Sequence, residues 1–121
     1  MPPVVLVVDA HEDTLEMYDA LLSASGYWVA CASTGGEALR SARRLQPGAI
    51  VIDVDQPGSI DVAQLVPAIR DTGPLHDVPI LAITARNAQD SVPILELRLS
   101  AILRKPVAPD MLVACVETAL G

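Results

Sequence analysis

Four side chains that could take part in phosphoryl or metal chemistry follow short apolar stretches of this sequence. Asp9 and Asp53 each end one such stretch, Thr84 ends a third, and Lys105 closes a fourth. Two carboxylates that lie together repel each other unless a divalent cation or a lysine sits among them. A carboxylate near Mg²⁺ can attack phosphorus to give an acyl phosphate, while a hydroxyl and an ammonium share the charge on the transferring oxygens. Asp53 is the candidate nucleophile, because the loop sequence after it leaves its carboxylate exposed.

The apolar stretches that end in these side chains have the length and composition of buried strands. They alternate with segments of helical period, which is the pattern of a parallel sheet wrapped by helices, so the fold class is α/β. We predict strands at 4–9, 28–32, 49–53, 79–84 and 101–104. Ligands of such sheets bind at the carboxyl ends of the strands. The two acids, the hydroxyl and the amine should therefore meet at one edge.

The segments between the predicted strands carry apolar residues at helical spacing, and we expect five helices. The second begins at a capping box, in which the side chains of Thr34 and Glu37 would satisfy each other's backbone donors. The third contains Pro67, which removes one backbone donor and should bend it. The first expected helix covers roughly 13–25, the second runs from the Thr34 cap to just before Pro47, and the third includes 62–69. The fourth is short or starts late within 87–100, and the fifth covers 109–120.

Length and composition are those of one packed domain, 1–121, with a core at about 4–120. Of the 121 residues 51% are hydrophobic and 19% are charged, which argues against disorder. The net charge of −7 disfavours nucleic acid and anionic membranes as partners, because phosphate binding needs clustered Lys and Arg. Apolar runs fall far short of the roughly 20 residues of a membrane helix, so we expect a cytoplasmic protein. Cys31 and Cys115 lack metal-ligand spacing and are expected to be free thiols.

Taken together, these motifs resemble a response-regulator receiver domain of bacterial two-component signalling. The resemblance runs from about Val4 to Leu120 and covers almost the whole chain. Its pieces are the apolar run that ends at Asp9, Gly26-Tyr27, Gly35 to Leu39, Asp53 with Pro57-Gly58, Pro79 to Ala85, and Lys105-Pro106. The fold that it implies is doubly wound and flavodoxin-like, with five parallel strands in the order 2-1-3-4-5 and five helices.

The resemblance also implies a function. Asp53 would accept a phosphoryl group from the phosphohistidine of a sensor histidine kinase or a histidine phosphotransfer protein, with Mg²⁺ as cofactor. Asp9, Asp53 and the backbone of Asp55 would hold the metal, Thr84 would bind a phosphoryl oxygen, and Lys105 would bridge to it. The domain would not be an enzyme beyond its own phosphorylation and dephosphorylation.

The chain departs from the receiver pattern at three positions near the acids. Ala10 stands where receivers carry a second acid that contacts the metal directly, so we expect weak Mg²⁺ binding. His11, Glu12 and Asp13 follow at once. They either start the first helix with acids near its positive end, or one of them supplies the missing ligand through a shifted loop. Ile102 replaces the usual aromatic residue three positions before Lys105. We expect the Asp55 side chain to solvate a turn rather than to approach the pocket.

Apolar residues outside the predicted core suggest a partner surface. Trp28, on the edge strand, is either an exposed interface anchor or folds over a neighbouring helix. The fifth helix is apolar almost all round, and with Ile94, Leu95 and Leu97 it suggests a surface over helices 4 and 5 for a homodimer or a kinase.

Two other functions stay open beside the phosphoacceptor. One is a degenerate receiver that acts as a phosphorylation-independent protein-interaction module, which the loss of the acid at Ala10 would permit. The other is a small flavodoxin-like enzyme or nucleotide binder. It is the less favoured, because no Gly-rich phosphate loop follows the first strand.

Overall fold

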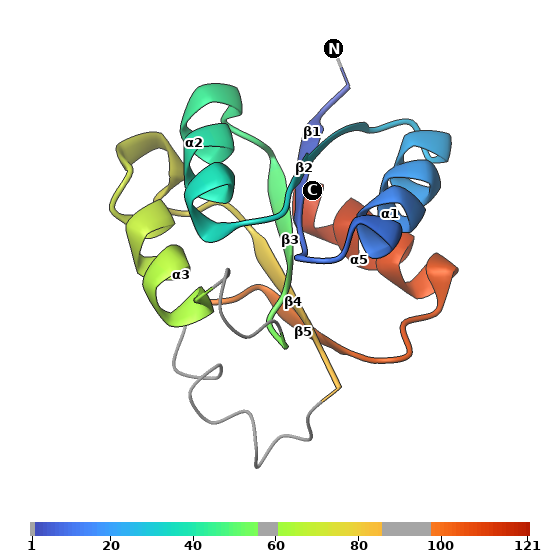
Figure 1. Ribbon diagram of the computed structural model, residues 1–121. Coiled ribbons are helices and arrows are strands. Elements are labelled where there is room, and N and C mark those ends of the chain that lie inside the picture. The colour runs from blue at the N-terminus through green and yellow to red at the C-terminus, as the bar shows by residue number, and fades with distance from the viewer. Residues whose placement is uncertain (1, 56–60, 86–97) are drawn as a thin grey trace.

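The computed structural model describes residues 2–55, 61–85 and 98–121, and these form one parallel sheet with helices on both faces (Figure 1). The five strands lie in the order β2-β1-β3-β4-β5, which confirms the predicted topology. They are β1 (Val4–Val8), β2 (Trp28–Ala32), β3 (Ala49–Asp53), β4 (Ile80–Thr84) and β5 (Ala101–Arg104). β1 ends one residue earlier than predicted, so that Asp9 lies just beyond the strand.

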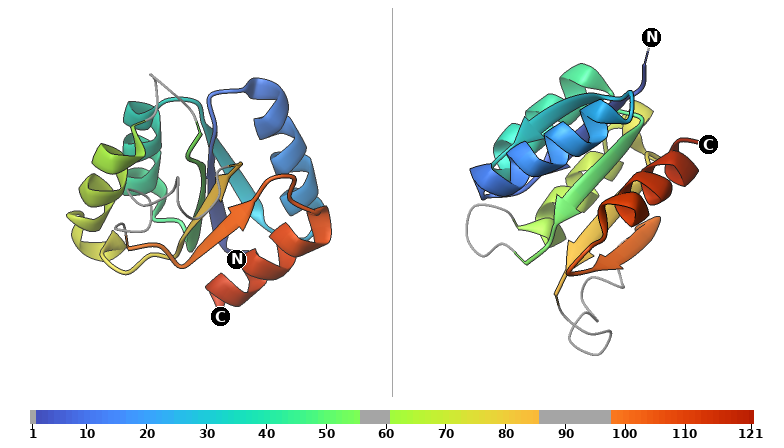
Figure 2. Two further views of the ribbon diagram at one scale, coloured as in Figure 1. Left: turned by 90° about the horizontal axis from the view of Figure 1, so that it is seen from below. Right: turned by 90° about the vertical axis from the view of Figure 1, so that its right-hand side faces the viewer.

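Four α-helices flank the sheet in the described part of the chain. They are α1 (Glu12–Ala24), α2 (Gly35–Leu45), α3 (Val62–Arg70) and α5 (Pro109–Leu120). The two further views show α2 and α3 on one face and α1 and α5 on the other (Figure 2). The predicted fourth helix falls almost entirely on residues outside the described ranges, and residues 98–100, which are described, are not helical. A short 3₁₀ turn at Gly73–Leu75 was not predicted.

The central strands β1, β3 and β4 are apolar before their last residues because both faces of the sheet are covered there. Leu6 and Val8 pack into the cluster under α2 and α3, whereas Val5 and Val7 pack into the cluster under α1 and α5. This alternation along one strand buries every residue of Val5–Val8, as expected for a parallel sheet between two helical layers. The doubly covered sheet is the rigid support for the strand ends.

The helix boundaries follow from local chemistry. Thr34 caps α2 by accepting a hydrogen bond from the Glu37 amide at 3.1 Å. The Glu37 carboxylate accepts a hydrogen bond from Ser33 Oγ at 3.5 Å, so only the threonine half of the predicted capping box is confirmed. Gly26, with φ of +97°, reverses the chain after α1, a conformation that L side chains rarely adopt. α3 continues through Pro67.

The connection from α3 to β4 is held by one half-buried cation, Arg70, that was not predicted. The Arg70 guanidinium donates hydrogen bonds to the carbonyls of Leu75 and Val78 and, at 2.6 Å, to the carbonyl of Arg98. Burial lowers the pKa of Arg70, and the charge of Arg98 lowers it further. These bonds fix the starts of β4 and β5 relative to α3, and so the positions at which the two strands end.

The predicted partner surfaces have mixed outcomes. Trp28 is 49% exposed, so of its two predicted placements the exposed one is confirmed. α5 is less exposed than its composition suggested, because Leu112 and Val116 are buried and Met111 alone is an exposed large apolar side chain of that helix. Ile94, Leu95 and Leu97 lie outside the described residues.

Candidate functional site

The register of the sheet brings the four predicted side chains to one edge. Asp53, the last residue of β3, pairs with Ile83, one residue before Thr84 at the end of β4. Lys105, just after β5, donates its amide to the Thr84 carbonyl at 2.8 Å. Asp9 follows Val8, which pairs with Ile52. Each side chain therefore leaves the carboxyl end of its strand beside its neighbours.

Asp53 and Lys105 form the central ion pair of this edge. Lys105 Nζ lies 2.6 Å from Asp53 Oδ2. The Asp53 side chain is only 2% exposed, so the expectation that the loop after it leaves the carboxylate exposed was wrong. Burial lowers the pKa of Lys105, but its hydrogen bond to Asp53 and the charges of Asp53 and Asp55 outweigh burial, so the pKa lies above its ordinary value. The ammonium is thus firmly charged beside the predicted phosphoacceptor.

The Asp55 side chain approaches the pocket, and the expectation that it solvates a turn was wrong. Its Oδ1 accepts a hydrogen bond from Thr84 Oγ1 at 2.7 Å, and its Oδ2 accepts one from the Ala85 amide at 2.6 Å. Lys105 Nζ lies 3.5 Å from Asp55 Oδ2. Burial raises the pKa of Asp55, but the bonds from Thr84 and Ala85 and the Lys105 charge outweigh burial and lower it. Two neutral donors, the Thr84 hydroxyl and the Ala85 amide, and the Lys105 cation hold this carboxylate beside Asp53.

The sequence signal for this placement was weak but present. Asp55 follows the predicted nucleophile by two residues, and its amide donates to Asp53 Oδ1 at 2.9 Å. That bond holds the loop close to the strand end. Its side-chain partners come from β4 and β5, far along the sequence, so that local turn preferences could not identify them.

Asp9 is fully buried beside the ion pair and is only partly satisfied. Its Oδ1 accepts the His11 amide at 2.8 Å, and His11 Nδ1 lies 3.3 Å away. Its Oδ2 has no hydrogen-bond partner within the described ranges. Burial raises the pKa of Asp9, the nearby Asp53 carboxylate raises it further, and the His11 amide opposes the shift. A buried carboxylate oxygen without a partner is suited to a bound cation.

No acid replaces the one missing at Ala10 in the described residues. Ala10 is half-buried and packs against the core, while Glu12 and Asp13 lie exposed in the first turn of α1. His11 is 70% exposed and contacts Asp9. No group of three or more His, Cys, Asp or Glu side chains that could hold a metal occurs in 2–55, 61–85 and 98–121. The remaining protein oxygens, from Asp9, Asp53 and the backbone of Asp55, fit Mg²⁺ only with water completing its shell.

A groove of about 600 Å³ opens beside the ion pair. Met17 and Tyr18 of α1 line one side, and Asp53 and Lys105 are among the residues that line the other. Met17 is exposed. This groove borders the Asp53–Lys105 pair on the α1 side.

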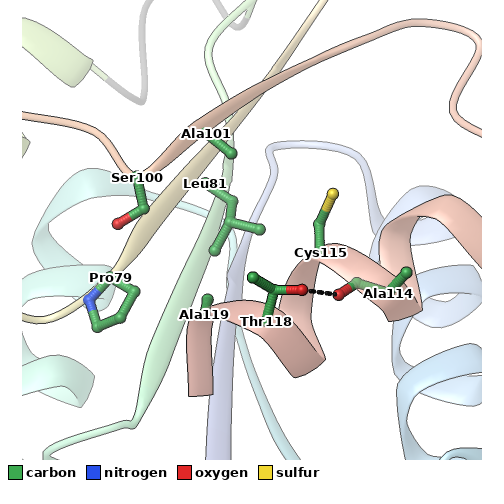
Figure 3. A pocket seen from close by; sticks show the side chains of 8 residues that line it. All are labelled: Pro79, Leu81, Ser100, Ala101, Ala114, Cys115, Thr118 and Ala119. Atoms are coloured by element: carbon green, nitrogen blue, oxygen red, sulfur yellow. Dashed lines mark hydrogen bonds between the residues drawn. The ribbon is translucent and has the colours of Figure 1, made fainter. Parts of the chain in front are cut away.

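A second pocket, of about 420 Å³, lies at the opposite end of the sheet (Figure 3). Pro79 and Ser100, which line it, precede β4 and β5, whereas Thr84 and Lys105 follow or end these strands. Cys115 and Thr118 of α5 line its other side. This second pocket lies at the amino ends of the strands. It is separate from the acidic pocket, by which we mean the site formed by Asp9, Asp53, Asp55, Thr84 and Lys105.

Comparison with known proteins gives a consistent result. The profile of the response regulator receiver domain family matches residues 5–117. The chain is 40% identical over 119 residues to the transcriptional regulatory protein PrrA of Mycobacterium tuberculosis, which covers 98% of this chain and 50% of PrrA. The chain therefore spans half the length of that relative.

Solved structures share the fold over the whole chain. The receiver domain of the sensor histidine kinase PA1611 from Pseudomonas aeruginosa, solved with a magnesium ion in its active-site cleft, is 27% identical with a TM-score of 0.90, covering 100% of this chain and 99% of that one. The chemotaxis response regulator CheY4 of Vibrio cholerae is 26% identical with a TM-score of 0.89, covering 98% and 99%.

Proposed function

The chain belongs to the response regulator receiver family of two-component signalling, and on that premise we propose that Asp53 is its phosphoacceptor. Members of this family are signalling domains rather than catalytic enzymes, and they pair with histidine kinases. The observation that carries the proposal is the ion pair of 2.6 Å between Lys105 Nζ and Asp53 Oδ2, next to the buried hydroxyl of Thr84. The donor of the phosphoryl group would be a phosphohistidine of a kinase or phosphotransfer protein.

The proposed reaction transfers one phosphoryl group between two side chains. An Asp53 oxygen attacks phosphorus, the new P–O bond forms as the P–N bond to the partner's imidazole breaks, and the imidazole keeps the electron pair and takes up a proton. Lys105 holds positive charge where the phosphoryl oxygens gather, and Thr84 supplies a hydroxyl donor. The groove on the α1 side gives the phosphohistidine access to Asp53.

Magnesium fits this pocket through Asp9, Asp53 and the backbone carbonyl of Asp55. The Asp9 oxygen that has no hydrogen-bond partner in the described part of the chain supports this assignment. When bound, Mg²⁺ supplies charge that offsets the negative oxygens of the transferring group. We further propose that its affinity is low, because Ala10 contributes no ligand and Lys105 already neutralises part of the charge of Asp53.

Incubation with a small phosphodonor and excess Mg²⁺, followed by intact-protein mass spectrometry, tests the assignment of Asp53. The expected result is the mass of one added phosphoryl group on the wild type and none on Asp53→Asn. A labelled Asp53→Asn protein, or a wild type that stays unlabelled at every Mg²⁺ concentration, would reject the proposal. Trp28 is a poor optical reporter for this work, because it pairs with Val4 at the amino end of the sheet.

The phosphorylation-independent interaction module is the second candidate, and two observations favour it. Ala10 leaves the metal side short of a ligand, and the donors opposite Asp53 are already engaged by Asp55. In this case the unlabelled wild type would still bind its partner kinase or target, with the same affinity as Asp53→Asn. Either form would work in the cytoplasm, and no helix in the described part of the chain is long and apolar enough to cross a membrane.

A homodimer through helices 4 and 5 is a further part of the proposal. Within the described residues it is supported by the exposed Met111 of α5 and by the pocket between α5 and the starts of β4 and β5 (Figure 3). Light scattering at increasing concentration tests it, with Met111→Glu as the variant expected to favour the monomer. A wild type that is monomeric at high concentration would remove this part.

A further inference from the structure

The Asp55 carboxylate holds donors that a phosphoryl group on Asp53 would need. Thr84 Oγ1 and the Ala85 amide both donate to Asp55, and Lys105 Nζ lies between the carboxylates of Asp53 and Asp55. We propose that Asp55 is an internal competitor of the phosphoryl group and limits the phosphorylation of Asp53. This inference rests on the proposed function of Asp53.

The geometry places the competitor next to the acceptor. The Asp55 amide is bonded to Asp53 Oδ1, and the same Lys105 nitrogen lies 2.6 Å from Asp53 Oδ2 and 3.5 Å from Asp55 Oδ2. A phosphoryl group attached to Asp53 Oδ2 would bring its oxygens toward Lys105 and Thr84, where the oxygens of Asp55 stand. Because both groups are anionic and would compete for the same donors, the carboxylate must leave before the phosphoryl group is bound.

The bonds of Asp55 differ from those of an acid that only forms a turn or caps a helix. Asp61 gives the comparison within this chain, since its carboxylate accepts the amide of Ala63, two residues ahead. Asp55 instead bonds residues 29 and 30 positions away, at the end of β4 and just beyond it. Its side chain is 19% exposed. Asp55 therefore ties the loop after β3 to the end of β4, across the pocket.

Removal of this carboxylate should therefore expose the donors. Asp55→Asn keeps the shape and an acceptor oxygen but removes the charge, whereas Asp55→Ala removes both. Asp71→Asn is the matched control, because Asp71 is an exposed acid after α3 and its loss changes the net charge equally. We expect beryllofluoride, in the presence of Mg²⁺, to bind Asp55→Ala about tenfold or more tightly than the wild type, with Asp55→Asn in between, since charge-assisted hydrogen bonds are among the strong ones.

The experiment is a beryllofluoride titration at fixed, high Mg²⁺, followed by the amide NMR signals of Thr84 and Ala85. In the absence of beryllofluoride the Ala85 signal should shift upfield in Asp55→Ala and stay in place in Asp71→Asn, because the short bond to Asp55 is lost only in the former. That first readout needs no phosphoryl chemistry. An Ala85 signal unaffected by Asp55→Ala would overturn the inference.

The titration itself separates the inference from the proposed function. Tighter binding by both Asp55 variants, with Asp71→Asn equal to the wild type, supports the competitor. Equal affinity in the wild type and both Asp55 variants overturns it while the phosphoacceptor role of Asp53 stands. Absence of binding in all proteins overturns both, because the exposed donors would then not accept a phosphoryl analogue at all.

Discussion

The two sides of the acidic pocket differ in how many hydrogen-bond and ion-pair partners their carboxylates have. On the β1 side, one oxygen of Asp9 has no partner among the described residues and Ala10 adds no ligand. On the side of β3, β4 and β5, Asp53 and Asp55 share Lys105, and Asp55 also accepts from Thr84 and the Ala85 amide. The side that would receive a cation is short of ligands, whereas the side that would receive a phosphoryl group is already filled by an anion.

This difference fits our proposals that the pocket keeps its acceptor, hydroxyl and amine but opposes their use at two separate points. We propose that the missing acid weakens metal binding and that Asp55 competes with the phosphoryl group. The two proposed effects arise at different strand ends, since Ala10 follows β1 and Asp55 follows β3. Substitutions on each side should therefore change different measurements.

The largest effect is expected on the rate of phosphorylation, from removal of the Lys105 cation on the side of β3, β4 and β5. Lys105→Met should lower the rate of Asp53 labelling by a small phosphodonor by about a hundredfold, because it removes the positive charge at the transferring oxygens. Intact-protein mass spectrometry over time measures the rate. Arg104→Met is the control, since Arg104 is an exposed cation one residue earlier, and its rate should equal that of the wild type. Similar rates for the two variants would refute the assigned role of Lys105.

A tenfold effect on Mg²⁺ affinity is expected from placing an acid on the β1 side of the pocket, which has few metal ligands. Ala10→Asp should raise the affinity for Mg²⁺ by about tenfold or more, because it offers a further hard oxygen ligand next to the Asp9 oxygen that no described residue bonds. Isothermal titration calorimetry measures it, with Ala10→Asn as the uncharged control. An affinity that does not change would mean that the missing acid does not limit the metal.

A smaller effect concerns stability and its dependence on pH. The pKa of Asp9 is raised in the folded protein by burial and by Asp53, so folding favours the protonated form. The contribution of Asp9 is therefore present below its ordinary pKa of 3.8 and is lost as the pH rises through the raised value. Asp9→Asn should be more stable than the wild type at pH 7 by about 1 kcal/mol, because the uncompensated charge is gone.

Urea unfolding at several pH values without Mg²⁺ measures this effect. The stability gain of Asp9→Asn should shrink as the pH falls toward 3.8. Asp13→Asn serves as the control, because Asp13 is an exposed acid in the first turn of α1. Its stability difference from the wild type should not follow the pH dependence expected for Asp9→Asn. A less stable Asp9→Asn protein at pH 7 would show that the carboxylate is satisfied in solution.

The smallest effect is expected at His11. His11→Ala should change the free energy of unfolding by less than about 0.5 kcal/mol, since the exposed imidazole contributes little and the backbone amide still donates to Asp9. Mg²⁺ affinity should also stay the same in the calorimetric titration. A clear loss of affinity would revive the hypothesis that His11 replaces the missing acid, and it would weaken the contrast between the two sides.

Much of the fold could be predicted because the signals for it are local. The apolar runs before Asp9, Asp53 and Thr84 marked buried strands, and the Thr34 cap marked the start of α2. The 3₁₀ turn at Gly73–Leu75 and the role of Arg70 could not be predicted, since each depends on carbonyls that only the assembled chain brings near. The wide apolar surface of α5 was overestimated, because composition does not show which residues the core covers.

The sequence by itself determined which residues end the strands, and with the parallel order of the sheet this placed Asp53 beside Lys105. Only the tertiary structure decided the partners of the other two carboxylates. Asp55 meets Thr84 and Ala85 across two strand ends, and one oxygen of Asp9 is buried without a partner in the described residues. The reason is physical: strand register is set by buried apolar contacts along the whole sheet, whereas the direction of a loop carboxylate depends on donors 29 and 30 residues away.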